Sequence, residues 1–119
     1  MKIAVTSKGR DLDSQVDPRF GRAAYILVID TDTLEYEVVD NSENAKAFKG
    51  AGIQAAAGIS DKKAEALLTG FCGPNAFKTL NAAGIRIADN AEGTVKEAVQ
   101  AFLDGKLTYA DAPNTDGHW

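Results

Sequence analysis

The chain's single cysteine lies in a short segment whose residue types could bind an anion or a soft metal. This segment reads Thr69-Gly70-Phe71-Cys72-Gly73-Pro74-Asn75-Ala76-Phe77. Pro74 suits the first position of a helix, because its missing N–H would have no intrahelical partner there. The amides of that first turn should then point outward at the positive end of the helix dipole, which favours anions. A thiol beside them should have a lowered pKa.

Soft sulfur next to anion-seeking amides suits a metal–sulfur ligand. We therefore predict that Cys72, Gly73 and Asn75 contact such a ligand, with Cys72 as a metal ligand. The alternative interpretation of the same residues is a tight turn that holds a buried, inert Cys72.

A second candidate segment lies within the long stretch from Ser7 to Ala24, which has no convincing periodicity. Loops of that length inside compact domains are uncommon and tend to be functional or disordered. In its second half, Arg19 and Arg22 flank Phe20 and a glycine, and guanidinium groups hold oxyanions or sulfide-rich ligands well. We predict both arginines as ligand contacts. We also predict Arg10 as a ligand contact, and Arg10, Lys46 and Lys49 would add positive charge at the rim. In the alternative, Phe20 fills the edge of the core while both arginines pair with nearby aspartates.

The sequence lacks the residues, or the spacing, that other kinds of site require. Asp11-Leu12-Asp13 begins like a calcium loop, but its sixth position would be Val16 and its twelfth Arg22. A two-metal nuclease needs carboxylates held rigidly at strand centres, and the strand expected at 2–6 has none. Gly50 and Gly52 do not continue into a phosphate-loop signature. No catalytic Ser–His–Asp or Cys–His set can be assembled, so a phosphate- or nucleotide-binding enzyme is the weakest alternative.

Length, composition and net charge exclude several classes of protein. A chain of 119 residues, 45% hydrophobic and 25% charged, fits one globular domain. The net charge of −4 argues against a general nucleic-acid binder. One cysteine cannot form an internal disulfide, the first residues lack a signal peptide's apolar stretch, and no segment approaches the roughly 20 apolar residues of a membrane span. We expect a cytoplasmic protein with no nucleic-acid or membrane partner.

Hydrophobic patterning predicts an α/β domain with a mixed five-stranded sheet flanked by helices. Strands are expected at 2–6, 25–30, 36–40, 64–69 and 85–88, and helices at 52–59, 74–83 and from a capping box at Thr94 to Gly105. The second and third strands should form an antiparallel hairpin, and the later strands should run parallel through helical crossovers. The helix at 52–59 should pack Ile53, Ala56 and Ala57 on the sheet.

The element order also predicts where a ligand would bind. Ligands of such sheets gather at the carboxyl ends of the parallel strands, where the Thr6–Lys8 region, the Cys72 turn and the Asp89–Gly93 loop all fall. Residues 1–107 form the predicted domain. Residues 108–119 lack periodicity and are predicted to be a flexible tail, which contains the only histidine, His118.

In these segments and their order, the chain resembles the nitrogenase iron–molybdenum cofactor biosynthesis family, the NifX/NifB C-terminal type domain. The matching segments are Met1–Ser7, Asp17–Ala23, Gly50–Gln54, Gly70–Phe77 and Gly93–Ala98. They span nearly the whole chain up to Leu107, and their shared order makes the resemblance specific. It implies a ribonuclease H-like α/β fold.

The resemblance also implies a function: a carrier or scaffold, not an enzyme, that binds a preformed anionic metal–sulfur cluster largely without covalent ligation. Stand-alone members of this size include one that carries a mixed molybdenum–copper sulfide cluster, and an iron–molybdenum–sulfur cluster is the second expectation. Proteins that deliver the cluster would be its partners. Many nitrogenase-linked relatives use a histidine as cluster ligand, and none lies inside the predicted domain here. The main alternative is a regulatory or interaction module that keeps the fold without an obligatory cluster.

Overall fold

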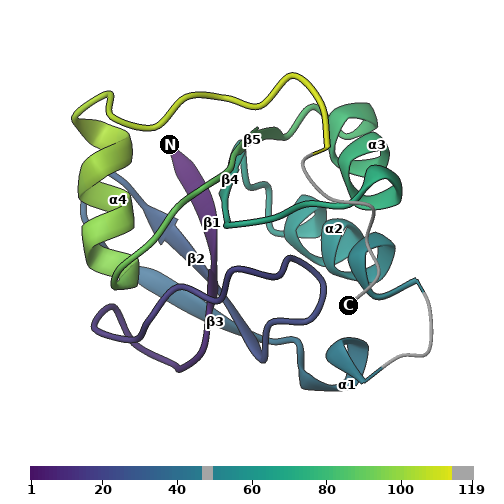
Figure 1. The fold of residues 1–119 in the computed structure, drawn as a ribbon. Helices are drawn as coiled ribbons and strands as arrows, with labels where there is room; N and C mark the ends of the chain where they lie inside the picture. The colour runs from purple at the N-terminus through teal and green to yellow at the C-terminus, as the bar shows by residue number, and fades with distance from the viewer. Residues whose placement is uncertain (47–49, 114–119) are drawn as a thin grey trace.

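Five strands form one mixed sheet in the order β3-β2-β1-β4-β5 (Figure 1). The computed structural model describes residues 1–46 and 50–113. The strands are β1 (Lys2–Ser7), β2 (Tyr25–Asp30), β3 (Tyr36–Asp40), β4 (Ala66–Leu68) and β5 (Arg86–Ala88). β1 pairs antiparallel with β2 and parallel with β4, β2 and β3 form the antiparallel hairpin, and β4 and β5 run parallel. The predicted mixed five-stranded sheet is confirmed, while the ribonuclease H-like label stays a prediction.

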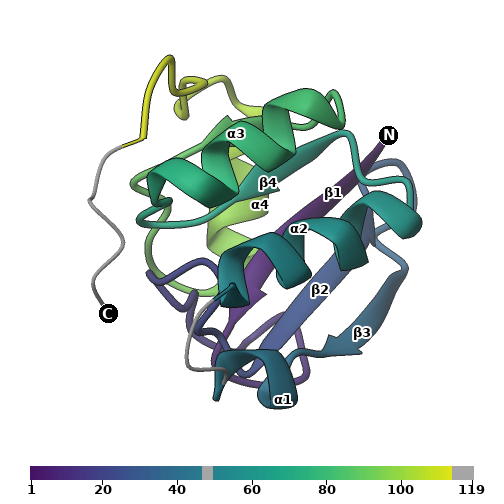
Figure 2. The same cartoon turned by 90° about the vertical axis from the view of Figure 1, so that its right-hand side faces the viewer.

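Helices cover both faces of this sheet. They are α1 (Ser42–Ala45), α2 (Ala51–Asp61), α3 (Pro74–Ala82) and α4 (Val95–Leu103). α2 and α3 lie on one face and α4 on the other (Figure 2). The capping box of α4 is present, because the Thr94 hydroxyl accepts from the Glu97 amide at 3.1 Å and the Glu97 carboxylate accepts from the Thr94 amide at 2.9 Å. No helix in the described part of the chain is long and apolar enough to cross a membrane.

Side-chain alternation along the strands builds two cores. Ile3 and Val5 of β1 pack toward α4, whereas Ala4 between them packs toward α2 and α3. The prediction for the face of α2 is wrong at two positions: Ile53 is 42% exposed and Ala57 is exposed, although Ala56 is buried. The buried positions are Ala51, Ala55 and Ile59, which are four residues apart, and Ala56, which lies on the same helix face. The small residues on this face let α2 approach its neighbours closely.

The long loop from β1 to β2 is ordered rather than regular. It folds back on β1 through an antiparallel bridge between Ser7 and Val16, and the amide of Val16 donates to the carbonyl of Gly93 at 2.9 Å. Val16 and Leu12 join the core beneath α4. The loop therefore runs across the end of the sheet and is held there on both sides.

The segment after α4 returns to the sheet. Tyr109 bridges Ala88 of β5, and the amide of Ala110 donates to the carbonyl of Ile87 at 2.7 Å. His118 and the rest of 114–119 lie outside the described residues. The boundary at Leu107 and the flexibility of the tail stay predictions.

Candidate functional site

The carboxyl ends of β1, β4 and β5 meet, as predicted, in one set of hydrogen-bonded loops, which we call the carboxyl edge (Pro18–Arg22 and Thr69–Asn75). The amide of Thr69 donates to the carbonyl of Ala88 at 3.1 Å, and the amide of Asn90 donates to the carbonyl of Gly70 at 3.1 Å. The Thr6 hydroxyl at the end of β1 lies 2.9 Å from the Thr69 hydroxyl, so the three loops expected at the strand ends are neighbours.

The arginine-containing loop is fastened directly to the cysteine turn. The Phe71 amide donates to the Pro18 carbonyl at 2.6 Å, the Phe20 amide donates to the Phe71 carbonyl at 3.1 Å, and Arg19 and Phe71 form a parallel bridge. A Cβ on Gly70 would lie within 2.8 Å of Pro18 atoms, so the two backbones can be this close only with glycine there. The first arginine and the cysteine turn thus share one side of the molecule.

A buried hydrogen-bond chain links the strand ends to Arg19. The Thr6 hydroxyl donates to the carbonyl of Asp17 at 2.6 Å and lies 2.9 Å from the Thr69 hydroxyl. Because a hydroxyl has one proton, Thr69 is the donor in that pair. The buried Asp17 carboxylate accepts from the Arg19 amide at 3.0 Å and lies 3.5 Å from its Nε. Neither threonine was predicted as a site residue, although a hydroxyl where an apolar strand ends was the signal that could have found them.

Two helix N-termini pack against this loop. Gly50 and Gly73 stand at the N-cap positions of α2 and α3, and glycine has no side chain with which to accept from first-turn amides. A Cβ on Gly21 would lie 2.8 Å from the backbone of Gly52, and a Cβ on Gly52 would lie 2.8 Å from the Cβ of Ala76. The positively polarised N-termini of two helices therefore lie beside each other and beside the loop, an arrangement that favours binding of an anion.

The three predicted arginines lie in different surroundings. Arg19 has a half-exposed side chain next to Asp17. Arg22 donates from Nη1 to the carbonyl of Ala45 at 2.9 Å, at the end of α1. Arg10 lies over the ring of Tyr25, 5.2 Å from its centroid. The structure therefore brings Arg19 to the cysteine turn and engages Arg22 and Arg10 toward α1 and β2, where their ligand roles stay predictions.

Asp40 partly offsets the positive charge predicted for the rim. The hydroxyl and then the amide of Ser42 hold the pKa of its carboxyl below the usual value, and the charges of Arg10 and Lys46 act in the same direction. Lys49, also predicted for the rim, lies outside the described residues.

The structure overturns the expectation for the thiol. Cys72 is 1% exposed and belongs to the core between the sheet and the pair α2 and α3. Burial raises the pKa of Cys72 to about 12, and the nearby charge of Asp89 adds to the rise. The lowered pKa predicted from the helix N-terminus is wrong, because loss of water outweighs the helix dipole at this depth. Gly73 is partly exposed, Asn75 is exposed in the first turn of α3, and the metal-ligand role of Cys72 stays a prediction.

This raised pKa makes a measurable contribution to stability. The Cys72 thiol has a higher pKa in the folded protein than in the unfolded chain, where it is about 8.5. The resulting stabilisation of the fold is fully present below pH 8.5 and is lost as the pH rises toward 12. We expect the difference in unfolding free energy between wild type and Cys72→Ala to shrink steadily from pH 8 to pH 10.5 in urea titrations. A constant difference over that range would show a thiol with an ordinary pKa.

Two further features complete the site. Asn41 is buried and donates from Nδ2 to the carbonyls of Gly21 at 3.2 Å and Ala23 at 2.8 Å, which holds the arginine loop from the far side. Phe20 is buried in the core, as the alternative interpretation expected.

Within residues 1–46 and 50–113, no three His, Cys, Asp or Glu side chains are grouped to hold a metal ion.

Solved structures share this fold. The orange protein of Desulfovibrio gigas, solved in its apo form, is 50% identical, with 96% of each chain covered and a TM-score of 0.93. A candidate NifB protein from Thermotoga is 38% identical, with 98% of each chain covered and a TM-score of 0.84. A candidate dinitrogenase from Methanocaldococcus jannaschii is 20% identical over 95% of this chain and 97% of that chain, with a TM-score of 0.70, which shows the fold alone.

Sequence comparison completes the assignment. No curated protein sequence matches this chain. The sequence profile described as dinitrogenase iron-molybdenum cofactor matches residues 1–105. That range contains every segment on which the predicted resemblance was based. The chain therefore belongs to the dinitrogenase iron-molybdenum cofactor family.

Proposed function

We propose that this protein binds and carries a preformed anionic metal–sulfur cluster at the carboxyl edge, as a carrier rather than an enzyme. Family membership supports a role with metal clusters. The observation that carries the proposal is the bridge between Arg19 and Phe71, which fixes the backbone of Arg19 beside the cysteine turn that opens α3, while the side chain of Arg19 is half exposed. A thiometallate cluster is multiply negative, and a guanidinium with helix-terminal amides matches it without covalent bonds.

The buried thiol argues for this non-covalent mode. A thiolate is the form of cysteine that binds metals, and a pKa of about 12 keeps Cys72 protonated at neutral pH. Arg19 and the first-turn amides around Asn75 need no deprotonation or movement out of the core. We therefore rank charge and N–H donors above sulfur ligation for cargo retention.

The proposed cargo is a molybdenum–copper sulfide cluster, supported by the resemblance to stand-alone family members that carry one. An iron–molybdenum–sulfur cluster, supported by the family's description, is the second candidate. Proteins that load and unload the cluster would be its partners.

Reconstitution tests the proposal directly. Protein purified without oxygen is mixed with tetrathiomolybdate and copper, desalted, and analysed for molybdenum, copper and visible absorption. We expect stoichiometric retention of both metals with a new charge-transfer band. A desalted protein that is colourless and metal-free, with iron–molybdenum cofactor as well as with copper and tetrathiomolybdate, would favour the interaction-module alternative.

A further inference from the structure

Exposed apolar side chains gather at the end of the molecule where β1 begins. Among the described residues six large apolar side chains are exposed, and four of them belong to this end: Met1, Leu34, Tyr36 and Leu103. The carbonyl of Met1 accepts from the Thr31 amide at 2.9 Å, which ties the N-terminus to the β2–β3 turn. Exposed apolar side chains that gather at one end of a molecule are typical of interaction sites.

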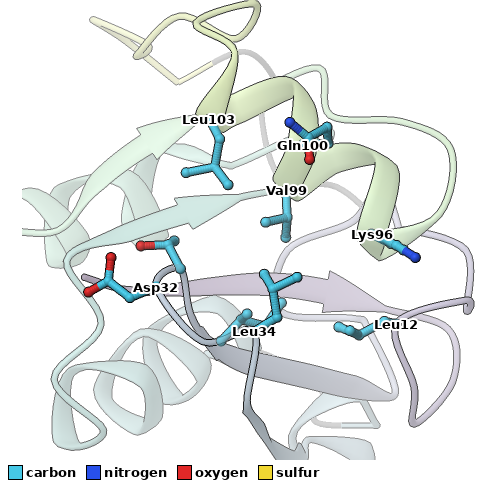
Figure 3. Close-up of a pocket in the computed structure, with 9 residues that line it drawn as sticks. Leu12, Asp32, Leu34, Lys96, Val99, Gln100 and Leu103 are labelled. Atoms are coloured by element: carbon cyan, nitrogen blue, oxygen red, sulfur yellow. The ribbon is translucent and has the colours of Figure 1, made fainter.

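The same end holds a groove between the β2–β3 turn and α4, which we call the hairpin-tip groove. It encloses about 200 Å³. Its apolar lining is Leu12, Ile29, Leu34, Val99 and Leu103. In Figure 3, Leu34 and Leu103 lie on opposite walls. The space suits one or two inserted aliphatic side chains rather than a larger body.

Leu34 occupies a backbone conformation that disfavours it. Its φ is +64°, in the left-handed region, where a non-glycine residue costs about 1–2 kcal/mol. Its amide donates to the Asp30 carbonyl at 2.8 Å, so the turn geometry is fixed. Glycine or asparagine suits such a turn position better. A leucine in a strained conformation that leaves 42% of its surface exposed stabilises the fold less than a buried leucine would, and a binding role would explain its presence in the groove wall.

The charges of the groove are separated along its length. Asp32 lies at the end near Leu103, and Lys96 lies at the other end near Leu12 (Figure 3). The Asp32 side chain is 84% exposed, although the N-terminal amine lies 3.7 Å from it. Residues 30–35 contain three carboxylates and no Lys or Arg. This wall therefore complements a cation.

We propose that the hairpin-tip groove is a docking site for a partner protein, which inserts aliphatic side chains between Leu34 and Leu103 and places a basic residue against Asp32. The Leu34–Leu103 end of the groove lies near the start of β1, and its Leu12 end lies on the α4 side of the sheet. The cysteine turn of the carboxyl edge follows β4 and packs on the opposite side, with α2 and α3. A docked partner would therefore leave Arg19 accessible. Nothing in this surface depends on cluster binding.

Peptide selection tests the site directly, with random sequences standing in for the partner. A phage library of random 12-residue peptides is selected on the full-length wild type, and enriched peptides are titrated by fluorescence polarisation. We expect enriched peptides to share an aliphatic pair flanked on one side by Lys or Arg. Leu34→Asn should weaken their binding about tenfold or more and leave the melting temperature unchanged or raised. Asp32→Asn should weaken only the peptides with the basic flank.

Ile53→Asn is the matched control, because Ile53 is an equally exposed aliphatic residue on α2. It should leave peptide affinity unchanged. Selection that enriches no shared pattern, or peptides that bind Leu34→Asn as tightly as wild type, would overturn the proposal. Self-association of the wild type that Leu34→Asn abolishes, seen by sedimentation, would assign the groove to a second copy of the chain and overturn it as well.

Discussion

Replacing Gly21 with alanine is expected to lower the free energy of unfolding by about 3 kcal/mol. The φ of Gly21 is +94°, a conformation that residues with a side chain rarely adopt. The new Cβ would also lie 2.8 Å from the backbone nitrogen and Cα of Gly52. Backbone atoms at the start of α2 cannot rotate away as a flexible side chain would. The arginine loop and the helix must separate, which should also weaken cargo binding. Thermal unfolding should show a fall in Tm of about 10 °C or more.

Two other glycines separate the causes of this effect. Gly84 has φ +77° with nothing within 4 Å of an added Cβ, so Gly84→Ala measures the backbone cost alone, about 1–2 kcal/mol. Gly58 lies in α2 with an equally open Cβ position, and Gly58→Ala should stabilise the helix by about 0.5–1 kcal/mol. A Gly21→Ala variant no less stable than Gly84→Ala would show that α2 yields, and that the close approach is not required.

Local sequence signals predicted most of the fold. The apolar run at Tyr25–Asp30 has the bounds of β2, and the capping box at Thr94 begins α4. These features depend on neighbouring residues only, so periodicity and capping chemistry suffice to find them. α1 was missed because four residues are too few for any period to show.

What the sequence left undetermined depends on contacts between distant segments. The rotation of α2 buries Ala55 and exposes Ile53, and the helix start lies against Gly21 of the distant arginine loop. Cys72 sits at the predicted strand–helix junction, yet its burial depends on how Phe20 and other residues close over the core. A single sequence does not give the depth of a side chain at a junction.

The candidate site shows the same division. Arg19 and Arg22 are three residues apart, and their types alone predict equal roles. The structure separates them, because the bridge to Phe71 holds Arg19 at the cysteine turn while Arg22 binds the end of α1 through the carbonyl of Ala45. The alternative interpretation expected both arginines to pair with nearby aspartates, and the structure shows such a pairing for Arg19 with Asp17. The burial of Asp17 could not be predicted from the sequence.

Replacing Arg19 with alanine is expected to weaken binding of the copper–tetrathiomolybdate cluster by about 10- to 100-fold. A hydrogen bond to a charged group contributes about 1.5–3 kcal/mol, and each 1.4 kcal/mol is a factor of ten in affinity. Cys72→Ser should change affinity much less, because its thiol is buried and protonated. Arg19→Lys should give an intermediate affinity, since it keeps the charge but loses the planar donor fork. Titrations followed by the cluster's visible absorption measure all three.

Arg86→Ala provides the matched control for net charge. Arg86 lies at the start of β5, and its guanidinium lies 4.1 Å from the ring centroid of Tyr109. Its replacement removes the same charge as Arg19→Ala does, but at the end of β5 that is remote from the carboxyl edge. If the overall charge of the protein governed binding, both alanine variants would weaken it alike. If the carboxyl edge holds the cargo, only Arg19→Ala does, and added salt weakens wild type more than Arg19→Ala. A Cys72→Ser variant that loses the cluster while Arg19→Ala retains it would reverse this order. Cargo would then be held by a thiolate that must leave the core before it can bind.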